Sequence, residues 1–133
     1  MKRGAIHTPS RAKQLIDYSG MLFDRGITPT DIDGFIEFND EISVFLEFKF
    51  GETEMPFGQR LALERLVDDC SEKKEAMLLV ATHDTDPEDQ IQAHSCSVTM
   101  YRYKGKWHQP REPVTVRKAV ERFLDWIETR SPL

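Results

Sequence analysis

The sequence contains only two cysteines, Cys70 and Cys96, and neither belongs to a CxxC pair or lies near a histidine cluster. This isolation argues against a zinc site or an iron–sulfur cluster and is typical of a protein in a reducing compartment. No apolar run approaches the roughly 20 residues that a membrane-spanning helix needs. Lys2 and Arg3 are not followed by an apolar stretch, so we expect no signal peptide and predict a cytoplasmic protein without membrane contact.

An excess of positive charge is also missing. The 133 residues include 18 Lys and Arg against 23 Asp and Glu, which gives a formal net charge of −5. Proteins that neutralise many phosphates present a basic face, so this balance predicts a small nucleic-acid footprint, a partner subunit or weak binding that is sensitive to salt. The length and the ordinary apolar content favour a single α/β domain over residues 1–133 with a core of its own.

What the sequence does have is an apolar hairpin over residues 30–50, TDIDGFIEFNDEISVFLEFKF. Two runs of Phe, Ile, Val and Leu flank a polar break at residues 39–41, which is typical of strand, turn and strand. A three-residue loop would set these cross-strand pairs: Phe38 with Ile42, Phe35 with Phe45, Asp33 with Glu47, and Asp31 with Lys49. A two-residue loop would instead send the acids to opposite faces.

The predicted register brings two carboxylates together. Directly opposed residues have Cβ atoms about 5 Å apart, and like charges at that distance are unfavourable. Asp33 and Glu47 would therefore share a proton, be solvated or bind a cation. We favour a cation. A plain salt bridge between Asp31 and Lys49 is the alternative.

The segments IDGFIEF and VFLEFKFGE, with Gly58-Gln59 downstream, resemble the PD-(D/E)XK nuclease superfamily. Its signature is an Asp near the start of one strand and an acid-x-Lys on the strand paired with it. The resemblance covers roughly residues 30–80, and Gln59 is similar to the Gln of the VRR-NUC type; a Holliday-junction-resolvase-like branch is a further candidate. Thr30 stands where Pro would precede Asp31, so the motif aspartate is either Asp31 or Asp33; register and strand context favour Asp33.

The resemblance implies a restriction-endonuclease-like fold with an αβββαβ core and a mixed central sheet flanked by helices, here with an extra C-terminal hairpin and helix. It implies Mg²⁺ or Mn²⁺ held by Asp33, Glu47 and the backbone carbonyl of Phe48, and hard oxygen ligands suit these ions. The expected catalytic residues are Asp33, Glu47, Lys49 and Gln59. The expected activity is hydrolysis of DNA by an endo- or exonuclease of repair or recombination, in a superfamily whose small domains often form homodimers. The sequence does not distinguish DNA from RNA as the substrate, or one bound metal ion from two.

The remaining elements follow from periodicity. Helical spacing predicts helices over residues 9–18, 57–71 and 115–129. The apolar run 76–81 predicts a buried strand that follows a crossover, and residues 98–107 predict a second hairpin. That hairpin combines rings with positive charge, which fits nucleic-acid contact or an edge kept soluble by lysine. Glu64 and Asp68 are expected on the solvated side of the second helix.

Three functions are compatible with these features. The first is a metal-dependent nuclease. The second is a nuclease-fold module that binds nucleic acid or protein without cleaving. The third is an interaction protein in which the acids are structural. Glu-x-Lys alone is common, so the conjunction of apolar strands, an Asp in register and a Gln-bearing helix is what favours the nuclease.

Overall fold

The computed structural model describes residues 15–130. The chain divides into two compact units, Met1–Thr30 and Asp31–Leu133, and the single domain over residues 1–133 stays a prediction. In the first unit the described residues form two short 3-10 turns, η1 (Ser19–Met21) and η2 (Asp24–Gly26). Most of the helix expected over 9–18 lies outside the described residues, and residues 15–18 are not helical.

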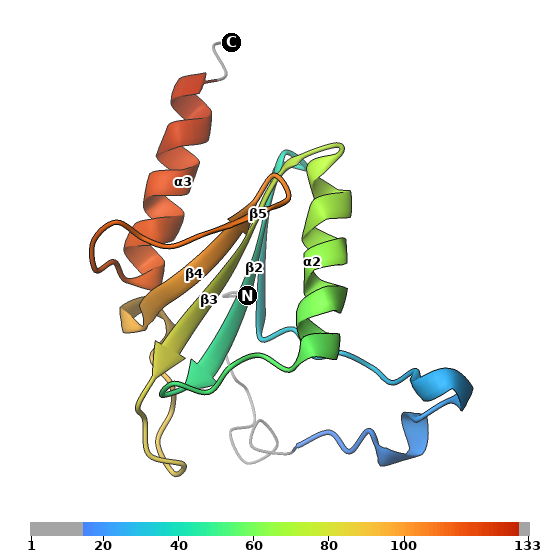
Figure 1. Ribbon diagram of the computed structural model, residues 1–133. Helices are drawn as coiled ribbons and strands as arrows, with labels where there is room; N and C mark the ends of the chain where they lie inside the picture. Colours follow the sequence, from blue (N-terminus) through green and yellow to red (C-terminus); the bar gives the residue numbers. More distant parts are fainter. Residues whose placement is uncertain (1–14, 131–133) are drawn as a thin grey trace, which may run out of the picture. The chain divides into compact units, whose positions relative to one another are not determined.

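The second unit is built on a five-stranded mixed sheet in the order β1-β2-β3-β4-β5 (Figure 1). Its strands are β1 (Gly34–Phe38), β2 (Ile42–Phe50), β3 (Glu75–His83), β4 (Ser97–Tyr103) and β5 (Lys106–His108). β2 and β3 are parallel and are joined through helix α2 (Phe57–Ser71), whereas the other neighbours are antiparallel. The α/β class with a mixed sheet is confirmed. Within residues 15–130, however, two strands precede α2, where an αβββαβ core has three.

The first hairpin has the predicted register, with Phe38 opposite Ile42 and Phe35 opposite Phe45. Its turn is tight because Asn39 and Asp40 adopt positive φ angles of 52° and 59°, a conformation that Asn and Asp tolerate well. The ladder ends at Gly34 opposite Leu46. The expected cross-strand pair between residues 33 and 47 therefore lies just beyond the ladder, in the segment that leads into β1.

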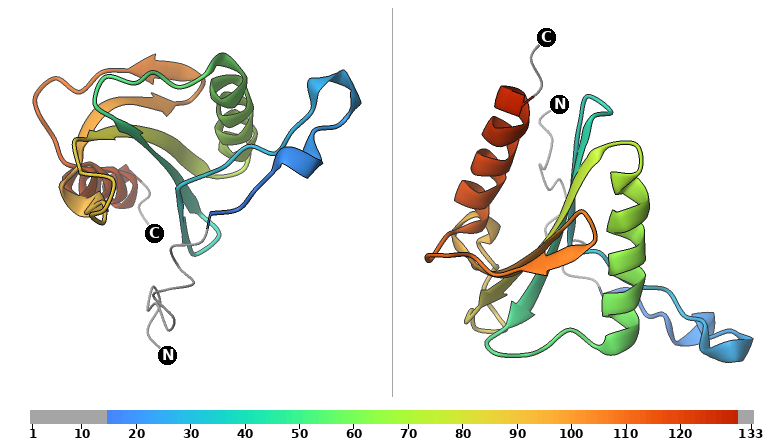
Figure 2. Two further views of the ribbon diagram at one scale, coloured as in Figure 1. Left: turned by 90° about the horizontal axis from the view of Figure 1, so that it is seen from below. Right: turned by 45° about the horizontal axis from the view of Figure 1, so that its top comes forward.

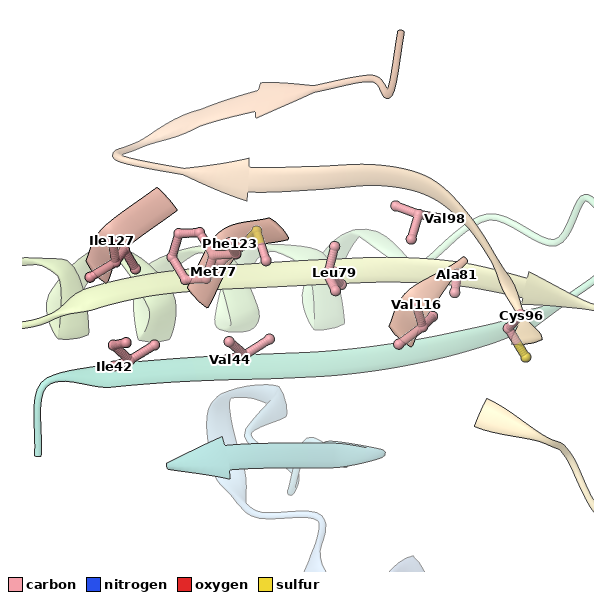
Figure 3. Packing of buried hydrophobic residues seen from close by; sticks show 10 residues of the cluster. All are labelled: Ile42, Val44, Met77, Leu79, Ala81, Cys96, Val98, Val116, Phe123 and Ile127. Atoms are coloured by element: carbon pink, nitrogen blue, oxygen red, sulfur yellow. The ribbon is translucent and has the colours of Figure 1, made fainter. Parts of the chain in front are cut away.

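The two helices cover opposite faces of the sheet (Figure 2). α2 packs on β3 and β4 over a small core of Phe45, Leu63, Val67, Ala76 and Leu78. α3 (Val116–Arg130) covers the other face, where its apolar stripe meets β2, β3 and β4 (Figure 3). The helices predicted over 57–71 and 115–129 are confirmed, the second with a shift of one residue. No helix within residues 15–130 has both the length and the apolar content to cross a bilayer.

The prediction that Glu64 and Asp68 are merely solvated is wrong. Arg102 of β4 donates from Nε and Nη2 to the two carboxylate oxygens of Asp68, at 2.9 and 2.7 Å. Its Nη1 donates to Glu64 Oε2 at 3.3 Å, and Trp107 Nε1 donates to the same oxygen at 2.6 Å. Arg102 is only 13% exposed. The cationic and indole side chains of the second hairpin therefore fasten β4 and β5 to α2.

Candidate functional site

The end of β2 and the first turn of α2 bring three polar side chains together. Side-chain alternation places Glu47 and Lys49 on the face of β2 that carries Phe45, which is the face α2 covers. Gln59 is the third residue of α2. Its Nε2 donates to Glu47 Oε1 at 3.0 Å, and its Oε1 accepts a hydrogen bond from Lys49 Nζ at 2.9 Å. Lys49 Nζ also lies 3.3 Å from Glu47 Oε1.

These contacts fix the orientation of the Gln59 amide. If the amide were reversed, its oxygen would face the carboxylate of Glu47 and its NH₂ group would face the ammonium of Lys49. Both arrangements are repulsive, because a carboxylate only accepts hydrogen bonds and an ammonium only donates them. Gln59, which belongs to α2, thus links the side chains of Lys49 and Glu47 on β2.

Asp33 reaches the same site from the segment before β1. Its Oδ2 accepts a hydrogen bond from the backbone N–H of Phe48 at 2.8 Å. Asp33 is therefore attached to the stretch of β2 that lies between Glu47 and Lys49, whereas no Asp31–Lys49 ion pair occurs within the described residues. Of the two candidate aspartates, Asp33 is the one that meets the Glu-x-Lys strand.

Glu47 is the most unusual group of the site. Its side chain is 3% exposed, and within residues 15–130 its Oε2 is buried without a hydrogen-bond partner. Burial raises the pKa of Glu47, the negative charge of Asp33 and the hydrogen bond to Asp33 that a proton on Glu47 allows raise it further, and the ammonium of Lys49 opposes these effects. A buried carboxylate oxygen without a partner is costly. A cation between Glu47 and Asp33 would satisfy that oxygen and compensate both charges.

The donors of the site fit a hard divalent ion. Asp33, Glu47 and the Phe48 carbonyl offer oxygen ligands only, which is what Mg²⁺ and Mn²⁺ prefer. Among residues 15–130 there is no group of three or more His, Cys, Asp or Glu side chains suited to a metal. Mg²⁺ needs only one or two carboxylates, because it keeps several waters and takes substrate phosphate oxygens as further ligands. The site therefore fits an open, hydrated ion and does not fit one enclosed by protein ligands.

Residues 83–92 add little to this site. His83 Nδ1 accepts a hydrogen bond from Thr85 N at 3.3 Å, and its ring meets Phe50 edge-on with centroids 5.6 Å apart. His83 and Asp84 line a separate polar hollow of about 390 Å³. The acidic side chains of the loop after Asp84 are exposed to solvent.

No family model matches the chain, and comparison with curated proteins and with solved structures gives no match either. What the site can do must therefore follow from its own geometry and chemistry.

Proposed function

We propose that the protein is a metal-dependent nuclease that hydrolyses phosphodiester bonds in DNA, with β1, β2, α2 and β3 as a restriction-endonuclease-like core. The supporting observation is Glu47 Oε2, a carboxylate oxygen that is buried without a partner among the described residues and beside a second carboxylate. A purely structural ion pair gives no reason to bury such an oxygen, because every unpaired buried acceptor lowers stability. A cation-binding site does give a reason to bury this oxygen, because the oxygen would be a ligand of the ion.

Each residue of the site has a distinct role in this proposal. Asp33, Glu47 and the Phe48 carbonyl would hold Mg²⁺ or Mn²⁺. When bound, such an ion supplies Lewis acidity, which activates water and screens the charge on the phosphate. Lys49 donates hydrogen bonds to the attacking water or to a phosphate oxygen, because its ammonium lies beside Glu47 and is partly exposed. Gln59 is a positioning residue that holds Glu47 and Lys49 in place.

Two observations favour a second candidate, a nuclease-fold module that binds without cleaving. The net charge of −5 is poor for tight binding of a polyanion. The ammonium of Lys49 is also already paired with Glu47 and Gln59. A module of this kind would bind divalent ions or nucleic acid but would not turn substrate over.

The test is cleavage of labelled DNA and RNA with Mg²⁺, with Mn²⁺ and with EDTA. Wild-type protein should cleave DNA only with a divalent ion, and Glu47→Ala and Lys49→Ala should each lose at least about 100-fold in rate. Glu72→Ala and Lys73→Ala are matched controls, since these side chains are exposed just beyond the end of α2. Cleavage that persists undiminished in both site variants would refute the site.

Calorimetric titration with Mn²⁺ separates the two candidates. Binding that Asp33→Ala abolishes, in a wild-type protein that cleaves nothing, would favour the binding module. Absence of any divalent-ion binding would contradict both candidates and leave the acids with a structural role.

A further inference from the structure

A half-exposed aromatic ring lies beside the site on β1. Phe35 is 55% exposed, although its ring stacks on Phe45 with centroids 5.0 Å apart and an angle of 30° between the planes. Phe45 is 5% exposed and belongs to the core beneath α2. One face of the Phe35 ring is therefore backed by the core, while the rest of the ring is open to solvent.

This ring shares the face of the sheet that carries the acidic site. Phe35 is paired with Phe45 across the hairpin, and Glu47 follows Phe45 by two residues on the same face of β2. Two residues along a strand span about 7 Å. A nucleotide next to a phosphate bound through a divalent ion at Glu47 would thus reach the ring of Phe35.

We propose that Phe35 is a stacking platform for an unpaired nucleobase beside the bond to be cut, and that the substrate class is single-stranded nucleic acid or an unpaired nucleotide at a duplex end or flap. This inference rests on the proposed nuclease function and gives it a substrate. Aromatic rings bind single strands by stacking on exposed base faces, which a duplex keeps covered by neighbouring base pairs.

Charge determines which part of a nucleotide contacts the ring. Glu37 lies two residues after Phe35 on the same face of β1, and its carboxylate repels a phosphate. Glu37 is held at the hairpin turn, where its Oε1 accepts a hydrogen bond from Asp40 N at 2.6 Å. A base, which is uncharged, meets no such repulsion. Stacking also supplies binding free energy that does not depend on positive charge, which this chain has little of.

The binding test uses a single-stranded oligonucleotide with 2-aminopurine placed at successive positions, because stacking quenches its fluorescence. It is carried out with Lys49→Ala protein so that the strand stays intact, with Mg²⁺ present. Quenching should occur with the Lys49→Ala protein. It should be lost in the double variant Lys49→Ala/Phe35→Leu, since leucine still packs on Phe45 but lacks a flat ring. Phe35→Trp should keep it. Phe38→Leu is the control, because Phe38 is also exposed but lies three residues further along β1 and on the other face. Equal quenching with and without the Phe35 ring would overturn the platform.

The cleavage test compares single-stranded with fully paired DNA of the same sequence. Phe35→Leu should lower kcat/KM on the single strand by about 5- to 100-fold and leave duplex cleavage unchanged. An equal effect on both substrates, or none on either, would contradict the assignment. A wild-type protein that cleaves neither substrate would contradict the proposed nuclease function instead, and the quenching experiment would still decide whether Phe35 stacks on a base.

Discussion

At the scale of single residues, Glu47 combines deep burial with two opposing neighbours. Asp33 makes its negative charge less favourable, and Lys49 makes it more favourable. Gln59 donates to one carboxylate oxygen and leaves the other without a protein partner in the described part of the chain. The carboxylate is thus held in place by one oxygen, and in the proposed site a divalent ion between Glu47 and Asp33 would bind the second.

The raised pKa of Glu47 makes the stability of the metal-free protein depend on pH. The folded protein binds a proton at Glu47 more tightly than the unfolded chain does. In the unfolded chain the pKa of Glu47 is near its ordinary value of 4.5. The stabilisation by this proton is present below pH 4.5 and is lost as the pH rises through the raised pKa of the folded state. Glu47→Gln removes the titration. In EDTA, the free energy of unfolding of wild type relative to Glu47→Gln should therefore fall as the pH rises.

Urea unfolding at a series of pH values from about 4 upwards measures this difference. Glu72→Gln is the control, because Glu72 is an exposed carboxylate and its substitution should leave the pH profile of wild type unchanged. A constant difference between wild type and Glu47→Gln across the series would show that the folded state does not raise this pKa.

Gln59 offers a second prediction at this scale. Gln59→Leu removes both hydrogen bonds that hold Glu47 and Lys49, so the single-turnover cleavage rate should fall about 10- to 100-fold. The free energy of unfolding should fall by only about 1–2 kcal/mol, because the ammonium of Lys49 still pairs with Glu47 Oε1. Gln90→Leu, in an exposed loop, is the matched control. A variant that cleaves at the wild-type rate would remove Gln59 from the site.

At the scale of elements, local patterns predicted most of the fold. The three-residue break at residues 39–41 predicts the hairpin register, because loop length sets which residues face each other. Apolar periodicity predicts both described helices to within one residue. The αβββαβ core implied by the resemblance has three strands before its second helix, whereas residues 15–130 form two before α2; Gly20, Gly26 and Pro29 interrupt the stretch before the hairpin.

The contact between α2 and the second hairpin could not be predicted in this way. Arg102 is 34 residues from Asp68, and helical spacing alone places Glu64 and Asp68 on the polar side of α2. Only the packing of β4 beside β3 brings the guanidinium beneath that side of the helix. A polar stripe on a helix therefore shows which residues are not core, but not which of them face water.

Arg102→Ala should lower the free energy of unfolding by about 2–3 kcal/mol, because it leaves the Asp68 carboxylate without a partner among the described residues and removes one donor from Glu64, which keeps that of Trp107. Chemical denaturation measures the loss. Arg117→Ala is the control, since Arg117 is 72% exposed and its ion pair with Glu121 joins neighbouring turns of α3; its loss should cost less than about 0.5 kcal/mol. Equal effects of the two substitutions would mean that Arg102 is no more than a surface residue.

At the scale of the whole molecule, the net charge of −5 restricts how nucleic acid can bind. Each phosphate contact to a single strand adds about −0.7 to the slope of log K against log salt concentration. We predict a slope shallower than about −2, since stacking and the metal site replace an extended basic surface. Fluorescence anisotropy of a labelled single strand at increasing NaCl and constant Mg²⁺ gives this slope. A slope steeper than about −5 would instead reveal a basic surface that the chain uses for phosphates.

The candidate site could be predicted from sequence only in part. The hairpin register predicted that Asp33 and Glu47 lie together, and the resemblance to a nuclease superfamily added Lys49 and Gln59 to the group. The missing Oε2 partner of Glu47, the Phe48 N–H bond to Asp33 and the open ring of Phe35 depend on tertiary packing, which no local pattern encodes.

A crystal structure of the protein with Mn²⁺ would show whether Asp33 and Glu47 together bind a divalent ion. An anomalous difference map should show a peak about 2 Å from Glu47 Oε2, from an oxygen of Asp33 and from the Phe48 carbonyl. If Mn²⁺ at millimolar concentration leaves no peak there, and Glu47 Oε2 stays buried without a ligand, the account of this site is contradicted.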